Sequence, residues 1–104
     1  MTQIELYNHL KSIGLPVSYH HFTETPVPPY LIYLFSYSND LIADNHNYKE
    51  ISYFQIELYT TKKDLSSEKL VEDKLKEIEL PYSKLEFWID SEKLFQVIYE
   101  IQLI

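Results

Sequence analysis

The sequence predicts an α+β fold in which one mostly antiparallel sheet of five strands has two helices packed on one face. Three observations predict it: two segments with helical spacing of apolar residues, five segments that alternate or run apolar, and short polar connections between them. The predicted order is α-β-β-β-α-β-β, in a single domain over residues 1–104. Domains of about 100–150 residues bury a core without disulfides or metals.

The first element is a predicted helix over residues 2–13. Thr2 and Glu5 match the capping box, in which a hydroxyl and a carboxylate each bind a free amide at the start of a helix. The apolar residues that follow recur on one face at helical spacing. Gly14 can adopt the left-handed conformation that ends a helix, and Pro16 cannot continue one.

Two predicted strands follow this helix. Residues 17–22 form a short edge strand, because the prolines at 26, 28 and 29 that come next cannot donate ladder hydrogen bonds. Residues 30–37 form the second strand, which is nearly continuous in apolar character. Residues 39–48 are then a polar loop that Leu41 and Ile42 interrupt. A loop of this length is either a mobile hairpin tip or a contact with a partner.

The stretch from Ile51 to Thr60 is the predicted interior strand of the sheet. Its residues alternate with a period of two, so one face is apolar and the other carries tyrosines. We expect both helices to pack on the apolar face and the second face to point elsewhere. The apolar face has Phe54, Ile56 and Leu58; the second has Tyr53, Gln55, Glu57 and Tyr59.

The last third of the chain predicts a helix and a hairpin. A helix over residues 66–79 would take Ser66 or Ser67 as its N-cap, and Glu72 and Lys76 have the spacing of a favourable pair. Its apolar stripe would be Leu70, Val71, Leu75 and Ile78. Strands over 84–89 and 94–103 flank a four-residue turn, with Leu85, Phe87 and Ile89 on one side of the first strand and Trp88 on the other.

Composition excludes several classes of function. The formal net charge is −7 and the chain has no arginine, which argues against binding nucleic acid through its phosphates. Without cysteine, neither disulfides nor thiolate metal sites can form, and one glycine, Gly14, cannot make a glycine-rich phosphate loop. No signal pattern or apolar run of about 20 residues is present, so we expect a soluble, cytoplasmic protein without membrane contact.

No group of residues predicts catalysis, a cofactor or a metal. His20 and His21 are adjacent and should point to opposite faces of a strand, so they do not predict a shared metal ion. Glu72 and Asp73 have the pattern of a solvated helix face. Glu57 and Glu100 each lie mid-strand and would line one acidic surface if their strands are neighbours, which suits an interaction at least as well as acid–base chemistry. We therefore predict that the protein is not an enzyme.

Several short motifs resemble one family of phage proteins. They are Gly14-Leu15-Pro16-Val17 with Tyr19; Pro28-Pro29-Tyr30; Ala43-Asp44-Asn45; Tyr53 and Gln55 with Glu57-Leu58-Tyr59-Thr60 and Lys63-Asp64; and Ser91-Glu92-Lys93 with Val97-Ile98-Tyr99-Glu100. Together they resemble the tail-completion, tail-terminator or head–tail joining proteins of long-tailed phages and prophages of Gram-positive bacteria. The resemblance spans about residues 3 to 101 and is structural, not catalytic.

This resemblance implies a structural role at the tail–head junction. Tail terminators have an α+β fold and form rings, typically hexamers, that cap the tail tube; their partners are other copies and tail-tube or head-connector proteins. It also implies a location in the host cytoplasm during assembly and later in the virion tail. An acidic lumen without arginine would let DNA slide without sticking. The alternative is a monomeric or dimeric α+β module with a regulatory or ligand-binding role, which would hold a small ligand between sheet and helix.

The candidate interface residues combine the long loop with the tyrosine-bearing face of the interior strand. The loop has two large apolar residues, and tyrosine is enriched at protein interfaces. We expect neighbouring subunits or the tail tube to contact Asp40, Leu41, Ile42, Asp44, Asn45, Tyr53, Gln55, Glu57 and Tyr59.

Overall fold

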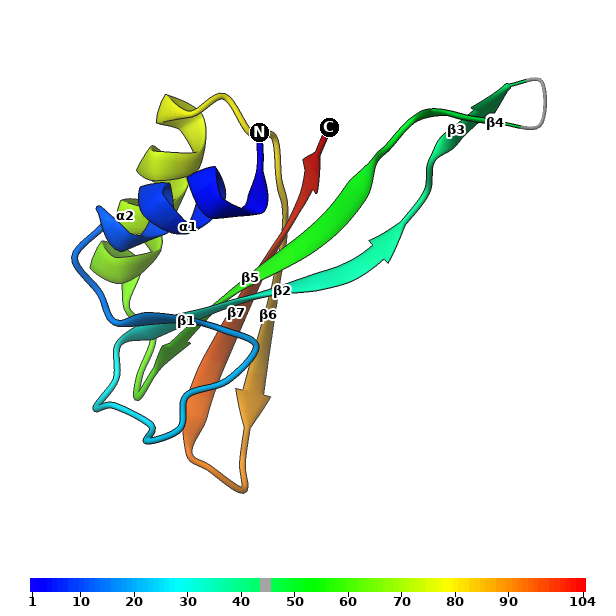
Figure 1. Ribbon diagram of the computed structural model, residues 1–104. Helices are drawn as coiled ribbons and strands as arrows, with labels where there is room; N and C mark the ends of the chain where they lie inside the picture. Colours follow the sequence, from blue (N-terminus) through cyan, green and yellow to red (C-terminus); the bar gives the residue numbers. More distant parts are fainter. Residues whose placement is uncertain (44–45) are drawn as a thin grey trace.

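The computed structural model describes residues 1–43 and 46–104, and the side chains of residues 1–40 and 50–104. These residues form two helices, one sheet of five strands in the order β1-β2-β5-β7-β6, and a separate pair of short strands. The sheet is mostly antiparallel and both helices lie on one side of it (Figure 1). The predicted fold class and element layout are confirmed.

Strand β5 (Ser52–Thr60) is the middle of the sheet, as the alternation in its sequence predicts. It is antiparallel to β2 (Tyr30–Ser38) on one side and to β7 (Leu94–Leu103) on the other. Ile56 lies opposite both Tyr33 and Tyr99, and all three are buried. The far edge is β6 (Ser83–Ile89), which forms a hairpin with β7.

Strand β1 (Val17–Tyr19) is parallel to β2, the one parallel pair among the described strands of the sheet. The prediction of an edge strand is confirmed, but its predicted end at residue 22 is wrong. The backbone turns at His20, which has a φ of 66°. A chain at positive φ leaves the extended conformation, so the strand ends at Tyr19.

The two helices cover the apolar face of the sheet, as expected. Helix α1 (Gln3–Lys11) begins at Thr2, and the predicted capping box with Glu5 is present. Helix α2 is Leu65–Glu77. Their buried residues Leu6, Leu10, Val71 and Leu75 form one core with Phe54, Ile56, Leu58, Val97 and Tyr99.

Two details of α2 differ from the prediction. Asp64, not Ser66 or Ser67, is the N-cap: its Oδ1 accepts the Ser67 N–H at 3.0 Å and its Oδ2 accepts the Ser67 hydroxyl at 2.8 Å. A carboxylate that accepts two bonds offsets the helix dipole better than a hydroxyl does. Leu70 was also wrongly placed in the core; it is 47% exposed.

The polar loop predicted over residues 39–48 is the end of a projecting β arm. Strands β3 (Leu41–Ala43) and β4 (His46–Lys49) pair antiparallel beyond the ends of β2 and β5. Figure 1 shows this pair extending well away from the helices and the rest of the sheet. The molecule is accordingly elongated, with a longest extent of 49 Å against 29 and 25 Å.

Replacing Asp64 by Ala should lower the free energy of unfolding by about 1 kcal/mol, because the first turn of α2 loses its capping acceptor. Ser66→Ala is the matched control: Ser66 is exposed in the same turn and should change stability by less than about 0.5 kcal/mol. Urea unfolding followed by circular dichroism measures both. Equal losses in the two variants would contradict the cap assignment.

Candidate functional site

The side of the sheet opposite the helices, here called the open face, has no helix over it in the described residues (Figure 1). Cross-strand register places its members side by side: Gln55 lies opposite both Leu34 and Glu100, and Leu85 lies opposite Ile98. The four predicted β5 residues all belong to it. Its central strands contribute Ile32, Leu34, Tyr53, Gln55, Glu57, Tyr59, Gln96, Ile98, Glu100 and Gln102.

Large apolar side chains are exposed at both margins of the open face. On the β6 margin, Leu85 is 55% and Phe87 48% exposed; on the β2 margin, Tyr37 is 46% exposed. Leu34, Ile98 and Tyr53 between them are partly buried. Exposed apolar side chains on a sheet face that no described helix covers are typical of a surface that contacts another protein.

Two tyrosine pairs give the open face a fixed shape. The rings of Tyr37 and Tyr53 stack at 4.3 Å between centroids, and the Tyr53 hydroxyl accepts a hydrogen bond from Gln102 at 3.0 Å. The rings of Tyr30 and Tyr59 stack at 5.1 Å at the other end of the strands. Rings held in this way lose little conformational freedom when a partner binds them.

The Tyr59 hydroxyl joins two neighbours on the open face. It donates to Glu57 Oε1 at 2.8 Å and accepts from Gln96 Nε2 at 2.8 Å. Burial, and then the bond to the Glu57 carboxylate, raise the pKa of Tyr59 above its ordinary value. The phenol therefore stays protonated and serves as a fixed donor, not as a base.

The acidic surface expected from Glu57 and Glu100 is present, because β5 and β7 are neighbours and both residues lie on the open face. The lysine within the described strands of the sheet, Lys84, lies on the opposite side, where it contacts α2. The open face thus combines apolar rings with carboxylates. The carboxylates make this surface locally negative, so it would repel phosphate groups.

The remaining candidate residues lie at the arm. Asp40 is at its base, where its Oδ1 accepts the Ile51 N–H at 3.1 Å. Leu41 and Ile42 are in β3, but their side chains lie outside the described part of the structure, and Asp44 and Asn45 lie outside it entirely. Tyr53 is at the arm end of β5, whereas Tyr59 is near its other end, so the structure does not gather all nine residues into one cluster.

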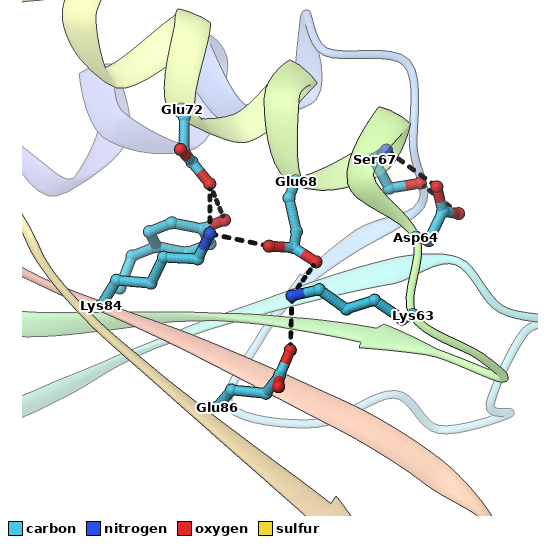
Figure 2. Close-up of polar contacts among 8 residues, drawn as sticks. Lys63, Asp64, Ser67, Glu68, Glu72, Lys84 and Glu86 are labelled. Carbon is cyan, nitrogen blue, oxygen red and sulfur yellow. Dashed lines mark hydrogen bonds and ion pairs between the residues drawn. The ribbon is translucent and has the colours of Figure 1, made fainter.

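An ion-pair network joins α2 to the sheet on the helix side (Figure 2). Glu68 is almost fully buried, and its Oε2 lies 2.7 Å from Lys63 Nζ. Its Oε1 lies 2.7 Å from Lys84 Nζ, but off the direction of a good hydrogen bond, so the attraction there is mainly ionic. Lys63 also contacts Glu86 at 2.6 Å. Nothing in the sequence pattern singled out Glu68, because its lysines come from other elements.

Glu72 belongs to the same network, and its predicted roles were wrong. It does not lie on a solvated face beside Lys76: its Oε2 contacts Lys84 Nζ at 2.8 Å and accepts the Tyr99 hydroxyl at 2.8 Å. Burial alone would raise the pKa of Glu68 and Glu72. The contacts of Glu68 with Lys63 and Lys84, and the hydrogen bonds from Lys84 and Tyr99 to Glu72, outweigh burial and lower the pKa of both. The contacts with Glu68 and Glu72 raise the pKa of Lys84. The network is a structural clamp between helix and sheet.

An open cleft of about 640 Å³ lies where the C-terminal end of α2 meets the ends of β5 and β7. Its wall includes Tyr53, Leu80, Tyr82 and Glu100. A second, similarly open cleft of about 520 Å³ lies on the open face beside Phe22 and Tyr59. Neither is the enclosed, largely apolar cavity that small ligands usually occupy.

The two adjacent histidines do not diverge as expected. Both lie beyond the end of β1, and the turn at His20 brings its Nδ1 to 3.2 Å from Nδ1 of His21. One ring must then donate to the other, which requires at least one neutral imidazole. Within residues 1–40 and 50–104, no three side chains of the His, Asp or Glu type are grouped as they would be around a metal ion.

No protein-family model matches the chain, and no curated protein is significantly similar to it. In the described part of the chain, no helix is both long and apolar enough to cross a membrane.

Proposed function

We propose that the protein is a structural subunit that assembles with other copies of itself and with phage tail or connector proteins, as a tail-terminator or tail-completion component at the tail–head junction. The observation that carries the proposal is the open face: a sheet surface with apolar and tyrosine side chains and no helix over it among the described residues. The resemblance of the sequence motifs to those of phage tail proteins indicates which kind of partner this surface would bind.

The shape of the chain supports an assembly role. The arm extends β2 and β5 beyond the body, so one subunit can reach a neighbour that its body does not touch (Figure 1). The rings of Tyr37 and Tyr53 stack on the open face near the base of the arm. Interfaces between subunits are enriched in such aromatic side chains.

Charge predicts how the assembly depends on salt. Glu57 and Glu100 on the open face would recur at each symmetry-related contact, and the net charge of each copy is −7. Like charges that meet repeatedly in a ring repel one another, and salt screens exposed charges over about 10 Å at 0.1 M. Assembly by the isolated protein should therefore be weak at low salt and stronger at high salt or with a partner present.

The test is sedimentation velocity of the wild type at low and high salt, alone and with tail tubes assembled from the tube protein encoded in the same phage. We expect species larger than the monomer at high salt, and binding to the tubes. The double variant Leu41→Ser, Ile42→Ser should lose at least about tenfold in tube binding, because two apolar contacts of the arm are removed.

The matched control carries Ile4→Ser and Leu70→Ser, which remove exposed apolar side chains from α1 and α2, away from the open face. It should assemble as the wild type does. A wild type that stays monomeric at every concentration, with and without tubes, would contradict the proposed function. If the arm variant behaves as the control does, assembly stands but the arm is not its contact.

A further inference from the structure

The outer edge of β6 is unpaired in the described part of the chain. β6 has β7 as its one neighbour, and Figure 1 shows it as the outermost strand on its side of the sheet. The seven residues Ser83–Ile89 therefore present a row of N–H and C=O groups to the outside. Such an edge is a template on which another strand can pair.

On β6 the devices that usually prevent edge pairing are reduced to two charges that face the helix side, each neutralised by an ion pair within the subunit. β6 contains no proline, and its register with β7 runs from Ser83 to Ile89 without a bulge. Its two charged residues, Lys84 and Glu86, are held on the helix side by Glu68, Glu72 and Lys63. Three of the other five side chains are large, apolar and about half exposed: Leu85 55%, Phe87 48% and Trp88 46%.

The opposite edge of the sheet is protected by comparison. β1 covers β2 from Leu31 to Tyr33, and beyond it the Tyr19 hydroxyl accepts the Phe35 N–H at 3.2 Å. The β2 register then shifts between Phe35 and Tyr37. Short edge strands, capped amides and bulges are the usual means of blocking edge-to-edge pairing. The β1–β2 edge of the sheet is therefore protected from pairing, whereas the outer edge of β6 is available for it.

We propose that the outer edge of β6 pairs antiparallel with the same edge of a second copy, around a two-fold axis near Glu86. A two-fold contact needs a surface that complements itself. Pairing centred on Glu86, the middle of the strand, brings every residue of β6 into register. Leu85 then lies opposite Phe87 of the second copy on the open face, and Lys84 opposite Trp88 on the helix side, where a cation and an aromatic ring attract.

Charge favours a second copy at this edge over face-to-face packing of two open faces. At the centre of the edge contact Glu86 meets Glu86 of the second copy, but Lys63 lies 2.6 Å from this carboxylate in each copy and offsets the repulsion. Face-to-face packing would instead set Glu57 and Glu100 against their own copies, without a lysine in the described strands of that face. Edge pairing therefore encounters less repulsion.

This contact goes beyond the proposed assembly at the tail, because it uses neither the arm nor the central strand of the open face. It makes one sheet that continues through both copies, with the helices of both on the same side. The two-fold pair would be the building unit that the arm and open face then join to the tail.

The chain contains no cysteine, so single cysteines can report which residues face each other. In Glu86→Cys the two new thiols should lie directly opposite, within the Cα separation of about 4.4–6.8 Å that a disulfide needs. We expect mild oxidation to cross-link this variant on the order of ten times faster than Ile4→Cys, because pairing raises the effective concentration of the thiols. Ile4 is 74% exposed on α1 and serves as the collision control.

A second set of variants tests the register and does not disturb the ion pairs. Leu85→Cys alone should cross-link slowly, as Ile4→Cys does, whereas Leu85→Cys mixed with Phe87→Cys should cross-link rapidly. The double variant Leu85→Lys, Phe87→Lys should be monomeric in sedimentation, since charges on an edge strand prevent pairing. Circular dichroism melting checks that each variant is folded.

Three outcomes would overturn the proposal: a wild type that is monomeric at all concentrations, a Glu86→Cys variant that cross-links no faster than Ile4→Cys, or a Leu85→Cys variant that cross-links alone as fast as in the mixture. The two cross-linking outcomes do not bear on tail binding, whereas a wild type that is monomeric with and without tubes would contradict both proposals. Conversely, the arm variant can be combined with Glu86→Cys. If that protein loses tube binding but still cross-links, the arm contact and the β6 edge contact are independent of each other.

Discussion

Replacing Ile56 by Asp should leave the protein unfolded at room temperature. Ile56 is 0% exposed in the middle of β5, between Tyr33 and Tyr99 in the neighbouring strands. An unpaired carboxylate at such a position costs several kcal/mol, which is comparable to the total stability of about 5–15 kcal/mol of a domain. Circular dichroism and a thermal melt of the purified variant measure the loss directly.

The matched control for this change is Ile4→Asp. Ile4 is 74% exposed in the first turn of α1, where a carboxylate interacts favourably with the helix dipole. We expect its unfolding free energy to stay within about 0.5 kcal/mol of the wild type. A folded Ile56→Asp variant that melts where the wild type does would show that the apolar side of β5 is not the core.

The second large effect should come from Glu68→Gln, which keeps the size of the side chain and removes its charge. Glu68 is buried beneath Lys63 and Lys84, and hydrogen bonds that involve a charged group contribute about 1.5–3 kcal/mol. Both lysines still reach water, so the loss should lie at the lower end, at about 1–2 kcal/mol. Urea unfolding near neutral pH gives the value.

The pH dependence of this loss identifies its cause. The pKa of Glu68 in the folded protein lies below its ordinary value of 4.5, so the carboxylate adds stability at pH values above 4.5. That stability is lost as the pH falls through the lowered pKa, because the unfolded chain then binds the proton more tightly than the folded one. The difference between wild type and Glu68→Gln should therefore shrink as the pH falls below 4.5 and vanish in stronger acid.

Glu86→Gln is the control for this experiment, since Glu86 binds the same lysine from an exposed position. An exposed ion pair contributes about 0–1 kcal/mol, so this variant should be close to the wild type at every pH. If Glu68→Gln and Glu86→Gln lose equal stability, burial of Glu68 is not what makes its charge important.

Local patterns in the sequence predicted most of the secondary structure. The alternation in Ser52–Thr60 predicted the central strand and the side on which helices pack, and the Thr2–Glu5 pair predicted the start of α1. These features depend on residues within a few positions of one another. The end of β1 and the cap of α2 were wrong for a local reason, because a positive φ at His20 and a carboxylate at Asp64 decide them.

The candidate site was predicted in part. Tyr53, Gln55, Glu57 and Tyr59 share one face because a strand alternates, and that needs no tertiary information. The exposed apolar residues of β6 on the same face were not predicted as part of the site. These residues are exposed because β6 is the last strand of the sheet. The order of strands in space determines that position, and the alternation within a single strand cannot predict it.

The sequence by itself therefore determined the elements of this protein, the apolar side of its sheet and the tyrosines of the other side. The tertiary structure decided which strand is left at an edge and which charges meet. Glu68 is in α2, Lys84 and Glu86 are in β6, and Lys63 is in the connection before α2. The packing of α2 on the sheet brings their charged groups within 2.6 to 2.7 Å. Contacts between residues that are distant in sequence depend on the whole fold. The distance between such residues is set by how the chain packs, not by their spacing along the chain.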